Sequence, residues 1–171
     1  MSGGGGAADI PQGPRVLAAG DGDVAGDPAG VRDRFMVDGK DSDGRFALVQ
    51  HLFAPRALAA PLHRHHQEDE FTFVLEGRIG AVLGDHEVVG GPGDLIFKPR
   101  NQWHTFWNAG DEPASVLEVI SPAGLEQFFR WLGTLAEPPD PDELAAMAAP
   151  YRCDADMDAT RAIVERHGLT F

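Results

Sequence analysis

Short apolar runs broken by Gly, Pro and Asp are the feature that most constrains the fold of this chain. From about residue 15 to residue 120, the runs RVLAA, RFMV, RFALVQHLF, EFTFVL, RIGAVL, HEVV, DLIFK, HTFWN and SVLEVI follow one another closely. Regularly spaced short runs of this kind are typical of an all-β sandwich or barrel. The Gly-Asp at 84–85 and the Asp-Gly at 43–44 are hairpin-type turn signals, because glycine tolerates positive φ angles. We therefore predict a β-barrel over residues 15–121.

The two ends of the chain follow other patterns. Residues 1–14 are rich in glycine and poor in apolar side chains, so we expect a flexible N-terminal tail. After residue 121 the pattern becomes helical: Ser121-Pro122 predicts a helix N-cap followed by proline, and apolar residues then recur at three- and four-residue steps. Two further helical runs start at Asp140-Pro141 and at Asp156, the second ending at Gly168. We expect residues 122–171 to form a short helical appendage that packs on the barrel, with a gating lid as the alternative.

Composition and charge exclude several classes of protein. A chain of 171 residues is sized for one domain. Its 27 acidic and 14 basic residues give a formal net charge of -13, and such a field repels phosphate backbones and anionic lipids. We therefore expect neither a nucleic acid nor a membrane partner. Cys153 is the single cysteine, which excludes an intramolecular disulfide, and the first 15 residues show no secretory signal pattern. We expect a cytoplasmic protein.

Histidines and carboxylates crowd into the segment PLHRHHQEDE at residues 61–70. On a strand, His63 and His65 project to one side and His66 to the other. A turn then leads into a strand that starts at Glu70, whose carboxylate can face the same interior as the two imidazoles. Imidazole and carboxylate donors suit a divalent ion such as iron, manganese, nickel, copper or zinc. The alternative for this segment is an exposed, charged hairpin.

Two spaced motifs resemble those of the cupin superfamily. They are HxHx4Ex6G at residues 63–77 and Gx5PxNx2Hx3N at residues 93–108. The resemblance covers about residues 30 to 121 and implies a jelly-roll barrel, also described as a double-stranded β-helix. The chain is similar to quercetinase-like members of this superfamily. The resemblance implies that one divalent metal ion is held by His63, His65, Glu70 and His104. Two positions depart from the family pattern, Ala57 and Asn101 standing where glycine is usual; asparagine tolerates the left-handed conformation.

Neighbouring side chains compete with two of these ligands. Three residues separate His66 from Glu70, but the parity of His66 with His63 is wrong unless the strand bulges. Glu68 and Asp69 are carboxylates beside Glu70, yet only Glu70 is separated from the motif glycine by six residues. We expect Glu68 and Asp69 to be solvated turn residues.

Strand parity also suggests which side chains line a substrate pocket. Thr72 and Val74 share the face of Glu70, Phe106 shares the face of His104, and either Gln50 or His51 faces inward from the preceding strand. The opposite face of the strand at 70–75 is apolar as well. We therefore expect this face to be covered by the C-terminal helices or by a second copy of the chain. The resemblance also implies a homodimer.

Three functional hypotheses follow. The first is an oxygen-dependent enzyme similar to flavonol or diketone dioxygenases, acting on a small aromatic or enolisable molecule, with Glu70 doubling as a general base. The second uses the metal as a Lewis acid for isomerisation, cyclisation, hydration or decarboxylation. The third is a non-catalytic module that binds a small molecule or senses a metal. The same four ligands serve all three, so the fold cannot choose among them.

Overall fold

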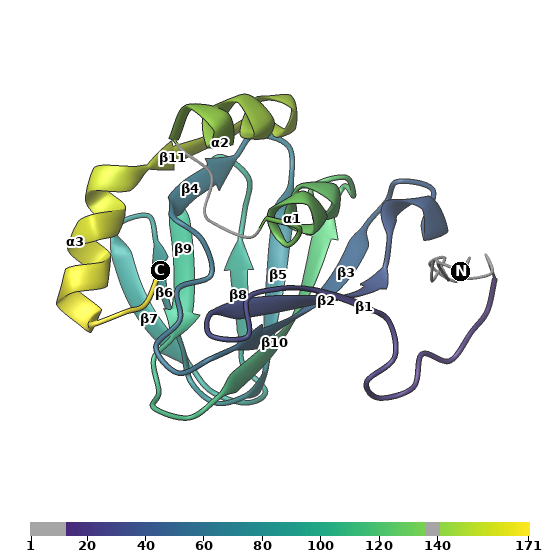
Figure 1. The fold of residues 1–171 in the computed structure, drawn as a ribbon, viewed down its shortest axis with the longest axis horizontal. Helices are drawn as coiled ribbons and strands as arrows, with labels where there is room; N and C mark the ends of the chain where they lie inside the picture. The colour runs from purple at the N-terminus through teal and green to yellow at the C-terminus, as the bar shows by residue number, and fades with distance from the viewer. Residues whose placement is uncertain (1–12, 136–140) are drawn as a thin grey trace, which may run out of the picture.

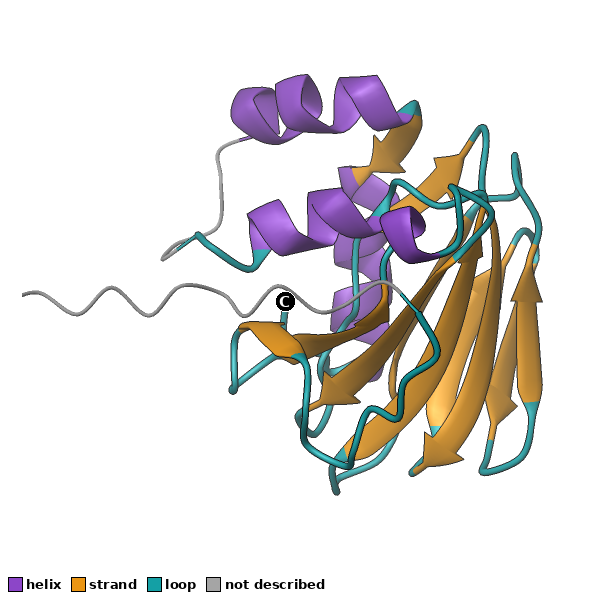
Figure 2. Cartoon of the chain, turned by 90° about the vertical axis from the view of Figure 1, so that its right-hand side faces the viewer, coloured by secondary structure: helices purple, strands orange, loops and turns teal. Residues whose placement is uncertain are grey.

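The computed structural model describes residues 13–135 and 141–171. Within them the chain forms two antiparallel sheets that face each other, and the helices gather to one side (Figures 1 and 2). Most of the predicted tail, residues 1–12, lies outside the described residues. Asp140, predicted to start the second helix, lies outside them too.

The larger sheet has six strands in the order β1-β2-β3-β10-β5-β8. Their bounds are β1 Asp23–Gly26, β2 Val31–Val37, β3 Ala47–Phe53, β10 Ala114–Ser121, β5 Asp69–Glu76 and β8 Leu95–Lys98.

The smaller sheet has five strands in the order β11-β4-β9-β6-β7. Their bounds are β11 Cys153–Asp156, β4 Leu62–His65, β9 His104–Asn108, β6 Ile79–Leu83 and β7 His86–Gly90.

The all-β prediction is confirmed, with corrections at its edges. Eight of the nine predicted runs contain strands, whereas RVLAA at 15–19 is not a strand. Two strands were not predicted, β1 and β11, and β11 belongs to the C-terminal segment.

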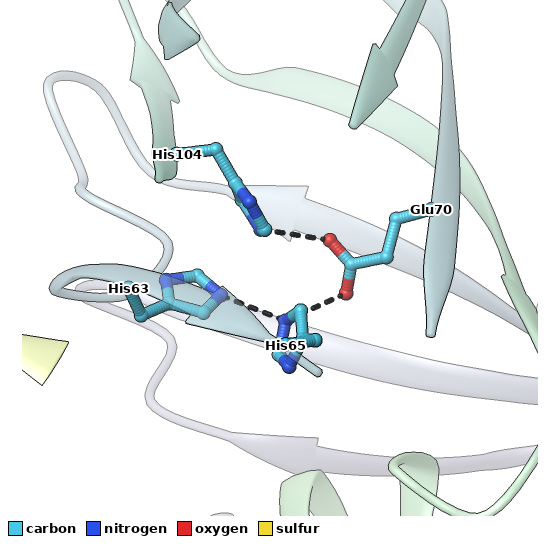
Figure 3. Close-up of side chains that lie close together, drawn as sticks. All are labelled: His63, His65, Glu70 and His104. Carbon is cyan, nitrogen blue, oxygen red and sulfur yellow. Dashed lines mark hydrogen bonds and ion pairs between the residues drawn. The ribbon is translucent and has the colours of Figure 1, made fainter. Parts of the chain in front are cut away.

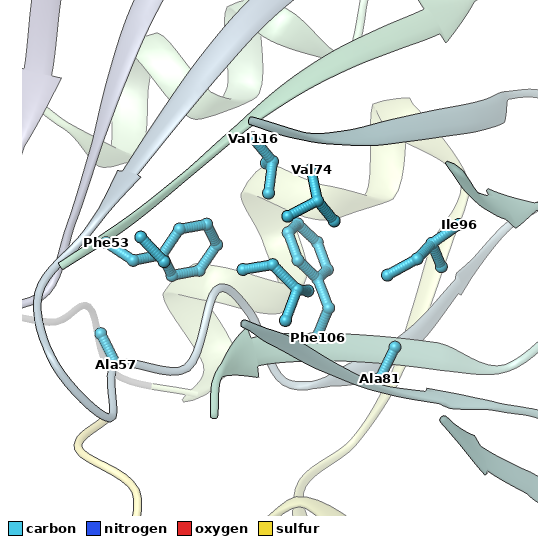
Figure 4. Close-up of a cluster of buried hydrophobic side chains, with 9 residues drawn as sticks. Phe53, Ala57, Val74, Ala81, Ile96, Phe106 and Val116 are labelled. Carbon is cyan, nitrogen blue, oxygen red and sulfur yellow. The ribbon is translucent and has the colours of Figure 1, made fainter. Parts of the chain in front are cut away.

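A hydrophobic core fills the space between the sheets (Figure 4). Along β3 the residues alternate between buried and half-buried, so one face of the strand looks into the barrel. The core cluster takes side chains from both sheets: Phe53, Ala57, Val74, Ile79, Ala81, Ile96, Phe106, Ala114 and Val116.

Two motif positions have clear backbone reasons. Gly77 has a φ of 79°, and a Cβ there would lie 2.6 Å from the Cβ of Ala114, so both conformation and space require glycine. Asn101 has a φ of 66°, which confirms that asparagine adopts the left-handed conformation where the family has glycine.

The C-terminal segment contains helices α1 Glu126–Leu132, α2 Pro141–Ala148 and α3 Met157–His167. Short 3-10 turns lie at Gly39–Asp41 and Ala149–Tyr151. The predicted cap at Ser121 is wrong: Ser121 ends β10, its hydroxyl donates to the carbonyl of Arg45, and Leu125 precedes α1. Gly168 ends α3 with a φ of 60°, as predicted, and the Asp156 carboxylate caps the start of the helix. No helix in the described ranges is long and apolar enough to span a membrane.

Candidate metal centre

Four side chains from both sheets converge inside the barrel. His63 and His65 come from β4, His104 lies opposite His63 on β9, and Glu70 reaches over from β5 in the other sheet (Figure 3). Their ligand atoms all lie within 4.8 Å of one another. The chain thus brings together all four residues proposed as ligands, and the cluster could hold a metal ion.

The competing side chains lie outside this cluster. His66 projects away, and its Nε2 lies 2.9 Å from Asp154 Oδ2. Asp69 accepts hydrogen bonds from the backbone N–H and the guanidinium of Arg100. The prediction that Glu68 is a solvated turn residue is wrong, because it is only 5% exposed and burial raises its pKa.

Each imidazole in the cluster has a partner for its outer nitrogen. The Nδ1 of His63 donates to the carbonyl of Pro61 at 2.6 Å, and that of His104 donates to the carbonyl of Gln102 at 2.9 Å. The Nδ1 of His65 lies 3.0 Å from the Sγ of Cys153. Such partners fix the tautomer and aim the Nε2 atoms at one another, as in protein metal sites.

The inner nitrogens need a cation between them. The Nε2 atoms of His63 and His65 are 2.9 Å apart. The Nε2 of His104 is buried without a hydrogen bond among the described residues, although Glu70 Oε2 lies 3.2 Å away. A neutral imidazole whose Nδ1 donates has a lone pair on Nε2, so these atoms repel one another unless a proton or a metal ion lies between them. The donor set therefore fits a divalent ion.

The pKa values of the histidines indicate where a proton lies in the metal-free cluster. Burial would lower the pKa of His65, but the Glu70 carboxylate and the Cys153 sulfur raise it to about 10. Burial and the neighbouring imidazoles hold the pKa of His63 well below its usual range. The raised pKa of His65 and the lowered pKa of His63 favour a proton on His65, between its neighbours His63 and Glu70, and a bound metal would replace this proton.

Glu70 is held as an anion. Burial alone would raise its pKa, but Lys98 and His65 hold it well below its usual range. The Lys98 ammonium lies 2.8 Å from Glu70 Oε2, while Oε1 faces His65 at 3.3 Å. A carboxylate of such low pKa is a weak base, so this environment favours a ligand role over the predicted general-base role.

Glu70 and four buried or half-buried side chains behind it form what we call the charge ladder. Lys98 lies 2.6 Å from Glu118, Glu118 lies 3.1 Å from His51, and His51 lies 2.6 Å from Asp33. Lys98 is fully buried, and its ammonium also sits 3.9 Å from the centre of the Phe106 ring. Because the charges alternate in sign from Asp33 to Glu70, each has an opposite neighbour that offsets its burial.

The predicted pocket residues separate into two groups. His51 faces the barrel interior, whereas Gln50 lies on the opposite face, where it accepts from Arg34 and donates to Ser115. Gln50 is therefore not the inward-facing residue. Thr72, Val74 and Phe106 are buried inside the barrel; Thr72 donates to Glu118, and the other two belong to the core cluster.

None of the residues Lys98, Glu118, Asp33 and Cys153 was predicted to belong to the site. Two of them carried a signal. Lys98 alternates with Phe97 and therefore shares the inward face of Ile96, and Glu118 is a single charge within the apolar run SVLEVI. Cys153 carried no such signal, because its contact depends on a strand pairing 88 residues away in sequence.

The sequence of this chain matches those of known proteins. A family model described as Cupin domain matches residues 49–120. Quercetin 2,3-dioxygenase of Bacillus subtilis (strain 168) is 30% identical over 129 residues, which cover 73% of this chain and 37% of that relative. The chain therefore spans well under half the length of this relative.

Solved structures also align with the chain. The polyketide cyclase RemF from Streptomyces resistomycificus aligns with a TM-score of 0.54 at 28% identity, covering 63% of this chain and 79% of that one. KdgF from Halomonas sp. aligns with a TM-score of 0.58 at 19% identity, covering 67% of this chain and 99% of that one. Motifs, fold and these matches agree that the chain belongs to the cupin superfamily.

Proposed function

We propose that this cupin is a metal-dependent enzyme that acts on a small organic molecule. The observation that carries the proposal is the convergence of three imidazoles and one carboxylate, each held by its own outer partner, inside a barrel. Iron, manganese, nickel, copper and zinc all suit these donors. A bound ion of this kind would polarise substrate oxygen atoms and, if redox-active, exchange electrons with dioxygen.

The side chains of the barrel would prepare this chemistry. The imidazoles of His63, His65 and His104 would hold the ion together with Glu70, which Lys98 keeps ionised. Val74 and Phe106 pack into the apolar core beside the charge ladder. An apolar wall next to fixed charges strengthens electrostatic interactions with a bound substrate, because water is excluded.

For the reaction itself, we propose dioxygen-dependent oxidation of an aromatic or enolisable molecule. The 30% identity to Quercetin 2,3-dioxygenase of Bacillus subtilis (strain 168) supports this class. An ion held by these four ligands could also bind a chelating substrate, which would suit an enolate or a catecholate.

A second candidate is non-redox catalysis on a carbonyl compound. It is favoured by the 28% identity to the polyketide cyclase RemF, whose alignment covers 79% of that chain. The same ligands would then hold an ion that acts only as a Lewis acid.

One set of assays separates these reactions. The metal-free protein is reconstituted in turn with iron, manganese, nickel, copper and zinc, and oxygen consumption is measured with flavonols, catechols and β-diketones. Oxygen uptake with a redox-active ion and none with zinc is expected. Substrate conversion without oxygen uptake, equal with zinc, would instead favour the second candidate. Tight retention of a small molecule without any conversion would indicate a binding module and contradict the enzyme proposal.

We also propose that the protein forms a homodimer through the outer face of β5 and β8. Four apolar side chains there are 44% to 51% exposed: Phe73, Leu75, Leu95 and Phe97. The C-terminal helices do not bury them. In the described residues β8 is the last strand of its sheet, so a second copy could extend the sheet and cover these side chains together.

A further inference from the structure

The C-terminal segment lies directly against the strand that carries two of the proposed ligands. Strand β11 pairs antiparallel with β4, with Cys153 opposite His65 and Ala155 opposite His63. This strand lies outside residues 49–120, where the cupin model matches. The ligand strand therefore has β9 on one side and the C-terminal strand on the other.

The pairing places Cys153 against the outer nitrogen of His65. The Sγ atom lies 3.0 Å from Nδ1 of His65 and 3.6 Å from the carbonyl oxygen of Tyr151. The sulfur can accept the Nδ1–H of the imidazole while its own hydrogen points to that carbonyl. His63 and His104 use carbonyls only two residues away for the same purpose, so His65 alone among the three depends on a distant segment.

Further contacts hold β11 in this register. Asp154 accepts from Arg64 at 2.7 Å and lies 2.9 Å from His66, both on the outer side of β4. The backbone N–H of Leu62 donates to the hydroxyl of Thr160 on α3 at 2.8 Å. These contacts near both ends of β4 hold the Cys153 thiol beside His65.

We propose that Cys153 is a positioning residue for His65, and that the C-terminal segment thereby completes the metal centre. The inference rests on the proposed metal site. Independent support for that site comes from the Nε2 of His104, which is buried without a hydrogen bond in the described residues. An acceptor on the outer nitrogen orients the ring and keeps the lone pair on Nε2. Loss of such an acceptor typically weakens metal binding about 10-fold to 100-fold.

Three full-length variants test this inference. Cys153→Ala removes the acceptor, Cys153→Ser restores one, and Asp154→Asn is a matched control that disturbs the same strand on its other side. The metal-free proteins are titrated with Co2+ and Zn2+ at one pH against a competing chelator, and the visible absorption of bound Co2+ is recorded. Melting temperatures of the metal-free proteins report separately on stability.

Cys153→Ala is expected to bind both ions about 10-fold to 100-fold more weakly and to change the Co2+ spectrum. The serine variant and Asp154→Asn are expected to stay within about threefold of the wild type. If the alanine variant does not fold, Cys153→Val, which suits a strand, replaces it.

If Cys153→Ala, or Cys153→Val in its place, keeps the wild-type affinity and Co2+ spectrum, Cys153 has only a structural role, whether or not the melting temperature falls. That result would overturn the inference and leave the proposed function intact. A wild-type protein that binds neither ion would overturn both.

Discussion

At the scale of single residues, the interior of this barrel is defined by charges that are buried together. Lys98, Glu118 and Glu70 are each at most 2% exposed, and each is in contact with an opposite charge. A buried ion pair adds little net stability compared with an apolar pair, but breaking one is costly, because an uncompensated charge stays behind. The role of the charge ladder is therefore to hold the Glu70 carboxylate in place as an anion.

Replacing Lys98 tests this interpretation. Lys98→Met leaves Glu70 and Glu118 without their shared ammonium, and we expect the free energy of unfolding of the metal-free protein to fall by about 3–5 kcal/mol. Urea denaturation measures it. The control is Lys40→Met, at an exposed lysine, with an expected change within about 0.5 kcal/mol. Equal effects of the two substitutions would contradict a structural role for the ladder.

His51 gives the ladder a pH dependence. Burial would lower its pKa, but Asp33 and Glu118 raise it from 6.5 to about 10. A group whose pKa is higher in the folded state contributes stability that is complete below its unfolded pKa and is lost as the pH rises. We expect the free energy of unfolding to fall between about pH 6.5 and 10 in the wild type, and less steeply in His51→Gln. Urea denaturation across this range is the measurement, and parallel profiles would count against the assignment.

At the scale of elements, the sequence predicted most of the barrel because period-two alternation and turn residues are local signals. The four ligands could be predicted because their spacing resembles the two cupin motifs, and strand parity distinguishes His65 from His66. The edge strands β1 and β11 could not be predicted, because DVAG and CDAD lack an apolar alternation. The burial of Glu68 and the choice of His51 over Gln50 depend on tertiary packing, which a single strand pattern does not contain.

Helix α3 is a testable part of this arrangement. Ile163 is 6% exposed and clusters with Leu58, Trp107 and Leu169, so the helix covers the outer side of β9. Ile163→Ala removes buried methyl groups, and we expect a loss of about 2–4 kcal/mol in the free energy of unfolding, measured in urea. Glu165→Ala, on the exposed side of the same helix, serves as control and should change stability by less than about 0.5 kcal/mol. A neutral Ile163→Ala would mean that α3 does not depend on this contact.

At the scale of the whole molecule, the exposed apolar face of β5 and β8 predicts self-association. Light scattering coupled to size exclusion should give the mass of a dimer for the wild type. Phe97→Asp places a charge in the middle of this face and should give a monomer, because a buried unpaired charge is costly. Val24→Asp is a matched control at a residue that is also 46% exposed, on strand β1. A monomeric wild type, or a dimer that survives Phe97→Asp, would contradict the proposed interface.

The proposed function requires that His63, His65, Glu70 and His104 bind one divalent ion. Its most direct test is elemental analysis of the purified protein after reconstitution with iron, manganese, nickel, copper or zinc, compared with His104→Ala and His66→Ala. We predict about one ion per chain in the wild type and in His66→Ala, and almost none in His104→Ala, which loses a ligand. Full metal content in His104→Ala, or none in the wild type with any of the five ions, would contradict the account.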